Sequence, residues 1–100
     1  MGSSDVEAIV FEALREVQEL GGHEWRPVAP NAAVIGVLEG FDSLTGIEAT
    51  VIVDQKIGKK LGRVEPLAGI DSIFVSRDGR KALSVAEVVS TVCAAIEVAA

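Results

Sequence analysis

A stripe of apolar residues near the start of the chain recurs at intervals of three and four positions, with charged residues between them. This spacing places the apolar side chains on one face of an α-helix. Ser4 and Glu7 match a capping box at its start, and Gly21-Gly22 can end it, so we predict a helix over about 4–21. The stripe consists of Val6, Ile9, Val10, Ala13, Leu14, Val17 and Leu20.

The chain has 100 residues, of which 49% are hydrophobic. Two domains of half this length would each be too small to bury a core that offsets the loss of chain entropy. The hydrophobic fraction is high enough for the chain to fold unaided. We therefore predict a single folded domain over 1–100.

The segment 22–41 has no apolar periodicity and contains Pro27, Pro30 and several glycines, so we predict a long ordered loop. Leaving a large apolar side chain in water forfeits about 1.5–3 kcal/mol. Several apolar side chains of this loop are therefore expected to fold back onto the core. They are Trp25, Val28, Val34, Ile35, Val37 and Leu38.

The segment 42–61 has two interpretations. Its β-branched run and Gly46 weaken a helix, and Glu48 to Asp54 read alone is compatible with a buried strand. Two features favour a helix. Asp42 is a good N-cap, and the lysines at 56, 59 and 60 lie where cations suit the negative end of the helix dipole. We predict a helix over about 42–61.

After Gly62 the chain passes through Pro66 and Gly69 into a region, 69–83, for which we predict a short helix followed by a turn. Asp78-Gly79 between apolar residues is also a hairpin signal. Ser84 and Glu87 form a second capping-box pattern before an apolar stripe, which predicts a last helix over about 84–98. The fold class is thus all-α, a small up-down bundle of three main helices plus a short extra helix.

Charge and residue content exclude several classes of function. A net charge of -6 with no Tyr and one Trp argues against nucleic-acid binding. The charged residues among the first twenty exclude a signal peptide or membrane span there, so we expect no membrane insertion and a cytoplasmic location. One histidine, His23, and one cysteine, Cys93, offer no metal-ligand spacing, so no metal is expected. His23 is expected to be a solvated loop residue, and Cys93 a buried small apolar one.

The most specific motif is Gly40-Phe41-Asp42-Ser43-Leu44, a Gly-x-Asp-Ser-Leu pentapeptide that places a hydroxyl at the start of the second predicted helix. A second string, Gly69-Ile70-Asp71-Ser72-Ile73, has a similar pattern. Downstream of Ser72, however, Gly79 interrupts any helix. Ser72 is therefore predicted to be a turn or cap residue, and Ser43 is the candidate site.

The pentapeptide, the order of the predicted elements and the downstream pairs Ile47-Glu48 and Val53-Asp54 resemble those of acyl carrier proteins over nearly the whole chain. The resemblance implies an acyl-carrier-like helical fold in which Ser43 is the attachment site of a phosphopantetheine arm and Asp42 helps a phosphopantetheinyl transferase recognise it. It implies a carrier of acyl thioesters, not an enzyme, for a specialised fatty-acid, lipid or polyketide-type pathway.

The resemblance further implies that the second helix docks acyl-loading and acyl-processing enzymes through Glu48, Val51 and Asp54. Ile47, Val53 and Ile57 are then expected in the core or in the lining of an acyl pocket. One departure is the basic cluster in the second helix and just after it, which puts the usual fatty-acid-synthase partners in doubt. Its members are Lys56, Lys59, Lys60 and Arg63.

Functions other than an acyl carrier are compatible with parts of this sequence. Asp42-Ser43 is also compatible with a simple helix cap. A serine hydrolase is disfavoured, since Ser43 has no Gly-x-Ser-x-Gly elbow and the only imidazole is that of His23 in a distant loop. No catalytic residues are therefore assigned. The main alternative is a carrier-fold protein that acts unmodified as an interaction or regulatory module. We expect a monomer in either case.

Overall fold

The computed structural model describes residues 2–62, 66–76 and 78–99, and within them it contains three α-helices and no strand longer than an isolated bridge. The helices are α1 (Ser3–Leu20), α2 (Ser43–Leu61) and α3 (Val85–Ala99). They coincide with the three helices predicted from the sequence, apart from shifts at their ends. No helix in these ranges is long and apolar enough to cross a lipid bilayer.

Local hydrogen bonds cap the starts of α1 and α3. The cap of α1 differs from the predicted one. α1 begins one residue earlier than expected, and its cap is Gly2, whose N–H donates to the Asp5 carboxylate at 3.1 Å. The predicted capping box at Ser84 and Glu87 is confirmed at α3. There the Ser84 N–H donates to Glu87 Oε1 at 3.0 Å, and the Glu87 N–H donates to Ser84 Oγ at 3.2 Å.

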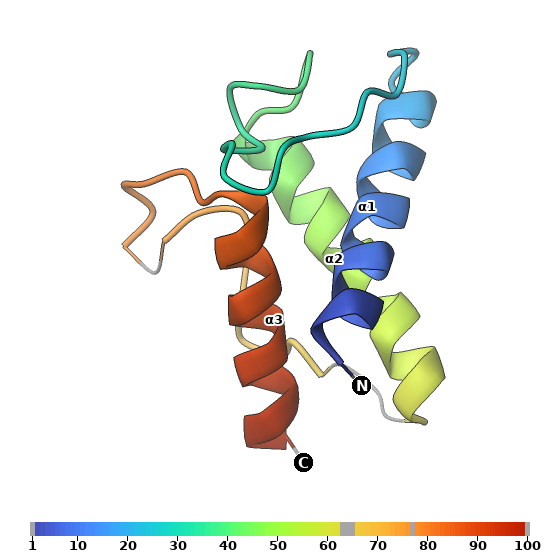
Figure 1. Cartoon of the computed structure of the whole chain (residues 1–100), viewed down its shortest axis with the longest axis vertical. Helices are drawn as coiled ribbons and strands as arrows, with labels where there is room; N and C mark the ends of the chain where they lie inside the picture. The colour runs from blue at the N-terminus through green and yellow to red at the C-terminus, as the bar shows by residue number, and fades with distance from the viewer. Residues whose placement is uncertain (1, 63–65, 77, 100) are drawn as a thin grey trace.

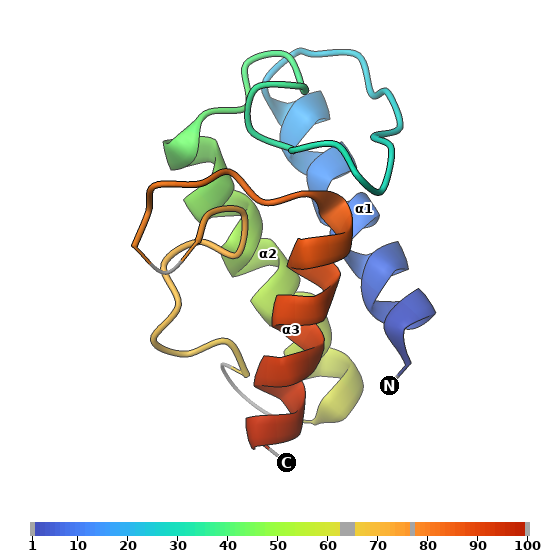
Figure 2. The same ribbon diagram turned by 60° about the vertical axis from the view of Figure 1, so that its left-hand side comes forward.

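The three helices form a bundle in which α1 packs against both α2 and α3. α1 runs antiparallel to the other two, whereas α2 and α3 run in the same direction (Figures 1 and 2). The prediction of an up-down order is therefore wrong for the second pair. The reason is the connection between them, which returns along the length of the bundle before α3 begins.

The core lies between the helices and is completed by both long connections. α1 contributes six apolar residues of the predicted stripe, but its seventh member, Leu20, is 85% exposed at the end of the helix. The Cα radius of gyration is 12.4 Å, close to the roughly 13 Å of a compact domain of this length. Apolar core residues from outside the helices are Val28, Val34, Leu38, Phe41, Leu67, Ile73 and Phe74.

The connection after α2 does not form the short extra helix predicted for 69–83. Its described residues instead form turns and an antiparallel bridge between Val75 and Ala82. Ser76 N–H donates to the Lys81 carbonyl at 2.8 Å, which closes the turn that Asp78-Gly79 signalled as a hairpin. Glycine and aspartate favour turns, so the local preference for a hairpin exceeds that for a helix here.

Candidate functional site: the N-terminus of α2

Ser43 is the first residue of α2 and is exposed, as is its predecessor Asp42. The Asp42 side chain caps the helix: Oδ1 accepts from the Thr45 N–H at 2.9 Å and from the Thr45 hydroxyl at 3.0 Å. The hydrogen bond from the Thr45 backbone is the main reason why the pKa of Asp42 is lowered. Asp42 is thus an ionised N-cap next to the exposed Ser43.

Immediately before this pair, the chain is anchored in the core. Phe41 is 4% exposed and its ring packs edge-to-face on Phe74, with centroids 5.3 Å apart. Buried Phe41 is therefore followed directly by exposed Asp42 and Ser43. The buried Phe41 side chain thus anchors the backbone directly before Ser43, whose side chain is exposed to solvent.

The second serine of the same local pattern has a different environment. Ser72 is half-buried, and its Oγ accepts a hydrogen bond from the Phe74 N–H at 3.2 Å. This contact is typical of a turn serine, as predicted. Ser72 also lies against α2, since a β-carbon on Gly46 would be 3.2 Å from its Oγ.

An apolar stripe on the outer face of α2 begins next to Ser43. It comprises Leu44, Ile47 and Val51, which are 66%, 41% and 52% exposed. Their spacing of three and four residues places them on one side of the helix. Ile47 therefore does not lie in the core, and it does not line the pocket between α1 and α2, whereas Val53 and Ile57 are fully buried as predicted.

The three residues expected to dock partner enzymes do not share one environment. Val51 is an exposed member of the apolar stripe, and Glu48 is exposed beside it. Asp54 is half-buried, and its Oδ1 accepts a hydrogen bond from the Leu67 N–H at 2.7 Å. Asp54 therefore fastens the connection after α2 to the helix, and this structural contact occupies one of its carboxylate oxygens.

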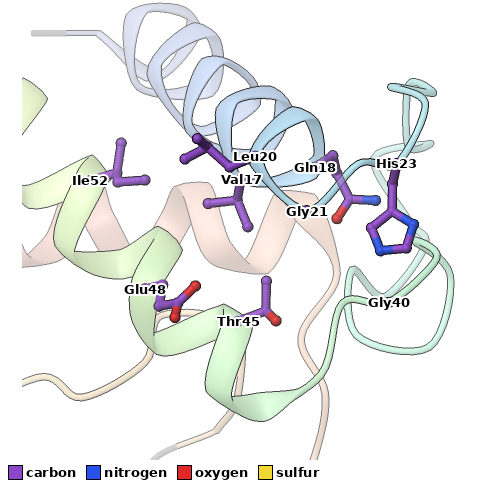
Figure 3. Close-up of a pocket in the computed structure, with 9 residues that line it drawn as sticks. All are labelled: Val17, Gln18, Leu20, Gly21, His23, Gly40, Thr45, Glu48 and Ile52. Carbon is purple, nitrogen blue, oxygen red and sulfur yellow. The ribbon is translucent and has the colours of Figure 1, made fainter.

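A shallow pocket of about 240 Å³ lies between the end of α1 and the first half of α2 (Figure 3). Pockets that enclose drug-sized ligands usually measure about 300–1,000 Å³, so this one is small for a long acyl chain. Its walls come from both helices and from the loop before α2. They are Val17, Gln18, Leu20, Gly21, His23, Gly40, Thr45, Glu48 and Ile52.

The basic residues of α2 divide into two groups. Lys56 reaches across to α1, where its Nζ lies 2.8 Å from Glu12 Oε1 and 3.2 Å from Glu16 Oε1. Lys56 therefore joins the two helices and is only 24% exposed, unlike a solvated helix end. Lys59 and Lys60 are exposed in the last turn of α2. Arg63, the fourth member of the predicted cluster, lies outside the described residues.

Two residues near the site, Gln18 and His23, were not predicted from the sequence to be site residues. Gln18 is 1% exposed, and its Nε2 donates to the Glu39 carbonyl at 2.9 Å. Its place four residues after buried Leu14 is the signal that its side chain faces inward. His23, expected to be solvated, is only about one-third exposed and packs over Gly40.

Within residues 2–62, 66–76 and 78–99, no three His, Cys, Asp or Glu side chains gather where they would hold a metal ion. A covalent group is better accommodated, because an exposed hydroxyl at a helix N-terminus is a suitable attachment point for a phosphate ester. No family model, curated protein or solved structure matches the chain.

Proposed function

We propose that the protein is an acyl carrier that receives a phosphopantetheine arm on Ser43. The observation that carries this proposal is the exposed serine at the first position of α2, preceded by an ionised cap, Asp42, and followed by the exposed apolar side chain of Leu44. These residues supply an attachment atom, a recognition charge and a docking contact within three consecutive positions.

The position of Ser43 suits a phosphodiester. The first N–H groups of a helix have no carbonyl partner within the helix, and the positive end of the helix dipole favours a negative charge. In the attachment step, Ser43 Oγ bonds to phosphorus and passes its proton to a base of the transferase. The pyrophosphate bond of coenzyme A breaks and its adenosine bisphosphate half leaves. When bound, the arm supplies a thiol that carries an acyl group as a thioester.

The outer face of α2 is the proposed docking surface for the transferase and for acyl-loading and acyl-processing enzymes. Leu44, Ile47 and Val51 supply apolar contact area, and Glu48 supplies a negative charge on the same side. Such a charge speeds the encounter with a basic partner more than it raises affinity. Asp54 contributes less to docking than Glu48, because the Leu67 N–H already occupies one of its oxygens. We place the carrier in a specialised fatty-acid, lipid or polyketide-type pathway.

The alternative is a protein with the same surface that acts without any modification. The apolar stripe favours it as much as it favours the carrier, because exposed apolar side chains in a row mark interaction sites in general. Only the chemistry of Ser43 separates the two functions. The deciding experiment therefore has to measure modification of this hydroxyl.

The test is incubation of the protein with coenzyme A and a broad-specificity phosphopantetheinyl transferase, followed by intact mass analysis. We expect the mass of the wild type and of Ser72→Ala to rise by one arm, and that of Ser43→Ala to stay constant. An unmodified wild type would support the alternative function. A gain that persists in Ser43→Ala and disappears in Ser72→Ala would transfer the site to the second serine.

A further inference from the structure

We infer that His23 is a positioning residue for Ser43: its ring clamps the loop before α2 against the end of α1 and so fixes where Asp42 and Ser43 are presented. This inference rests on the proposed function, because it concerns the same hydroxyl. It adds a residue that lies twenty positions away in the sequence, at the opposite end of the same connection between α1 and α2.

The clamp consists of an imidazole lying between two glycines. A β-carbon on Gly21 would lie 3.1 Å from His23 Cδ2, and one on Gly40 would lie 2.9 Å from Cε1 and overlap Nε2. Gly40 has a positive φ of 69°, a conformation that glycine adopts without strain. The first residue of the pentapeptide is therefore glycine for two reasons: its backbone angle and the ring above it (Figure 3).

Other contacts hold the same short segment from both sides. The His23 N–H donates to the Gln18 carbonyl at 2.8 Å, which fixes His23 on the end of α1. The Gln18 side chain donates to the Glu39 carbonyl at 2.9 Å. The Glu39 carboxylate lies 3.9 Å from His23 Nδ1, and Phe41 is buried directly after Gly40. Each residue from 39 to 41 thus has a contact with the core, with α1 or with His23.

Asp42 and Ser43 are the first exposed residues after this held segment. A modifying enzyme binds a site more weakly when the competent arrangement is only a fraction of the population, in proportion to that fraction. The expected effect of releasing the clamp is therefore a higher KM for the carrier with a nearly constant kcat. If releasing the clamp lowers the competent fraction by about three- to tenfold, the KM rises by the same factor.

The experiment measures transferase kinetics with the carrier as the varied substrate, for wild type, His23→Ala, Gly40→Ala and the double variant. We expect KM to rise by roughly three- to tenfold in each single variant. The KM of the double variant should rise by less than the product of the two single increases, because removal of the His23 ring makes room for the new methyl group on residue 40. His23→Phe retains a ring over Gly40, so its KM should be closer to that of the wild type than to that of His23→Ala.

Two controls separate positioning from general loss of structure. Gly36→Ala also places alanine at a positive φ, 98°, but no atom lies within 4 Å of the added β-carbon, so it should leave KM unchanged. Val89→Ala removes buried volume from α3, far from the clamp in sequence, and lowers stability without changing KM at a temperature where the protein stays folded.

The outcomes distinguish this inference from the proposed function. If wild type is modified and His23→Ala has the same KM, His23 does not position the site, and the carrier function stands. Equal increases in KM for His23→Ala and Val89→Ala would likewise overturn the clamp, since they would reflect stability alone. If wild type is not modified at all, the proposed function itself fails, and the clamp fails with it.

Discussion

The hydroxyl of Thr50 joins α2 to the connection that follows it, because Oγ1 accepts a hydrogen bond from the Ile73 N–H at 3.0 Å. The same hydroxyl donates to the Gly46 carbonyl at 2.8 Å, one turn earlier in the helix. Both Thr50 and Ile73 are buried, so neither group has water as a substitute partner. Together with the bond from the Leu67 N–H to Asp54, this contact holds the 66–76 segment on α2.

Thr50→Val keeps the shape of the side chain but leaves the buried Ile73 N–H without an acceptor, and we expect a loss of about 1–3 kcal/mol in the free energy of unfolding. Urea denaturation measures it. Thr91→Val is the matched control, since Thr91 Oγ1 donates to the Glu87 carbonyl one turn earlier but accepts no bond from a backbone N–H of the described residues. It should change stability by less than about 0.5 kcal/mol. Equal effects of the two substitutions would contradict the assigned role of Thr50.

Lys56→Met should lower stability in a way that depends on pH. The hydrogen bond from Lys56 is the main reason why the pKa of Glu12 is lowered, and the bond to Glu12 is the main reason why the pKa of Lys56 is raised. A lowered carboxyl pKa contributes stability above its unfolded value of about 4.3, and this is lost as the pH falls through the folded value. The difference between wild type and Lys56→Met should therefore shrink below about pH 4.

The measurement is urea denaturation of both proteins at neutral and acidic pH, with Lys59→Met as the control from the exposed last turn. Added salt should also reduce the effect of Lys56→Met, because the carboxylates it joins are solvent-exposed. A difference that is constant from neutral to acidic pH would show that the aliphatic stem of Lys56, not its charge, stabilises the helix pair.

Ser84→Ala should destabilise the protein by about 1 kcal/mol, because it removes the side-chain acceptor for the Glu87 N–H at the start of α3. Thermal denaturation followed by circular dichroism measures the change. Ser90→Ala, at an exposed position inside the same helix, should be neutral or slightly stabilising, since alanine is the better helix former there. The capping role is excluded if both variants shift the midpoint in the same direction and by the same amount.

Val51→Gln and Leu44→Gln should change stability by less than about 0.5 kcal/mol, because both side chains are more than half exposed. If the outer face of α2 docks the transferase, the same substitutions should lower kcat/KM for modification of Ser43 by about tenfold or more, the effect of losing an apolar contact at an interface. Val37→Gln is a control for exposure alone, since Val37 is 57% exposed in the loop between α1 and α2 and belongs neither to the apolar stripe nor to the pocket. A loss of similar size in that variant would argue against a specific docking face.

Apolar stripes were sufficient to predict α1 and α3, whereas α2 was predicted from the Asp42 N-cap and the lysines near its end. The β-branched run and Gly46 in α2, which favour a strand when read alone, have a packing explanation. Gly46 is buried where Ser72 and the ring of Phe74 approach, and Thr50 holds the Ile73 N–H. Tertiary contacts therefore account for the residues that lower helix propensity.

The predictions that are wrong concern the contacts that a side chain makes in the folded protein. Ile47 and Leu20 are apolar and correctly spaced, yet no element covers them, so both are exposed. Asp54 is taken up by the Leu67 N–H, and His23 is drawn over Gly40. The parallel course of α2 and α3 also depends on where the 66–83 segment packs. None of these contacts leaves a periodic signal in the sequence.

Because α1 runs opposite to α2 and α3, the beginning of α1 and the end of α3 lie at one end of the bundle, and the beginning of α2 lies toward the other (Figures 1 and 2). Ser43 is the first residue of α2. A fusion partner or surface tether joined at either terminus would therefore leave the serine end facing outward. Immobilised in this way, the protein would offer its hydroxyl to an enzyme in free solution.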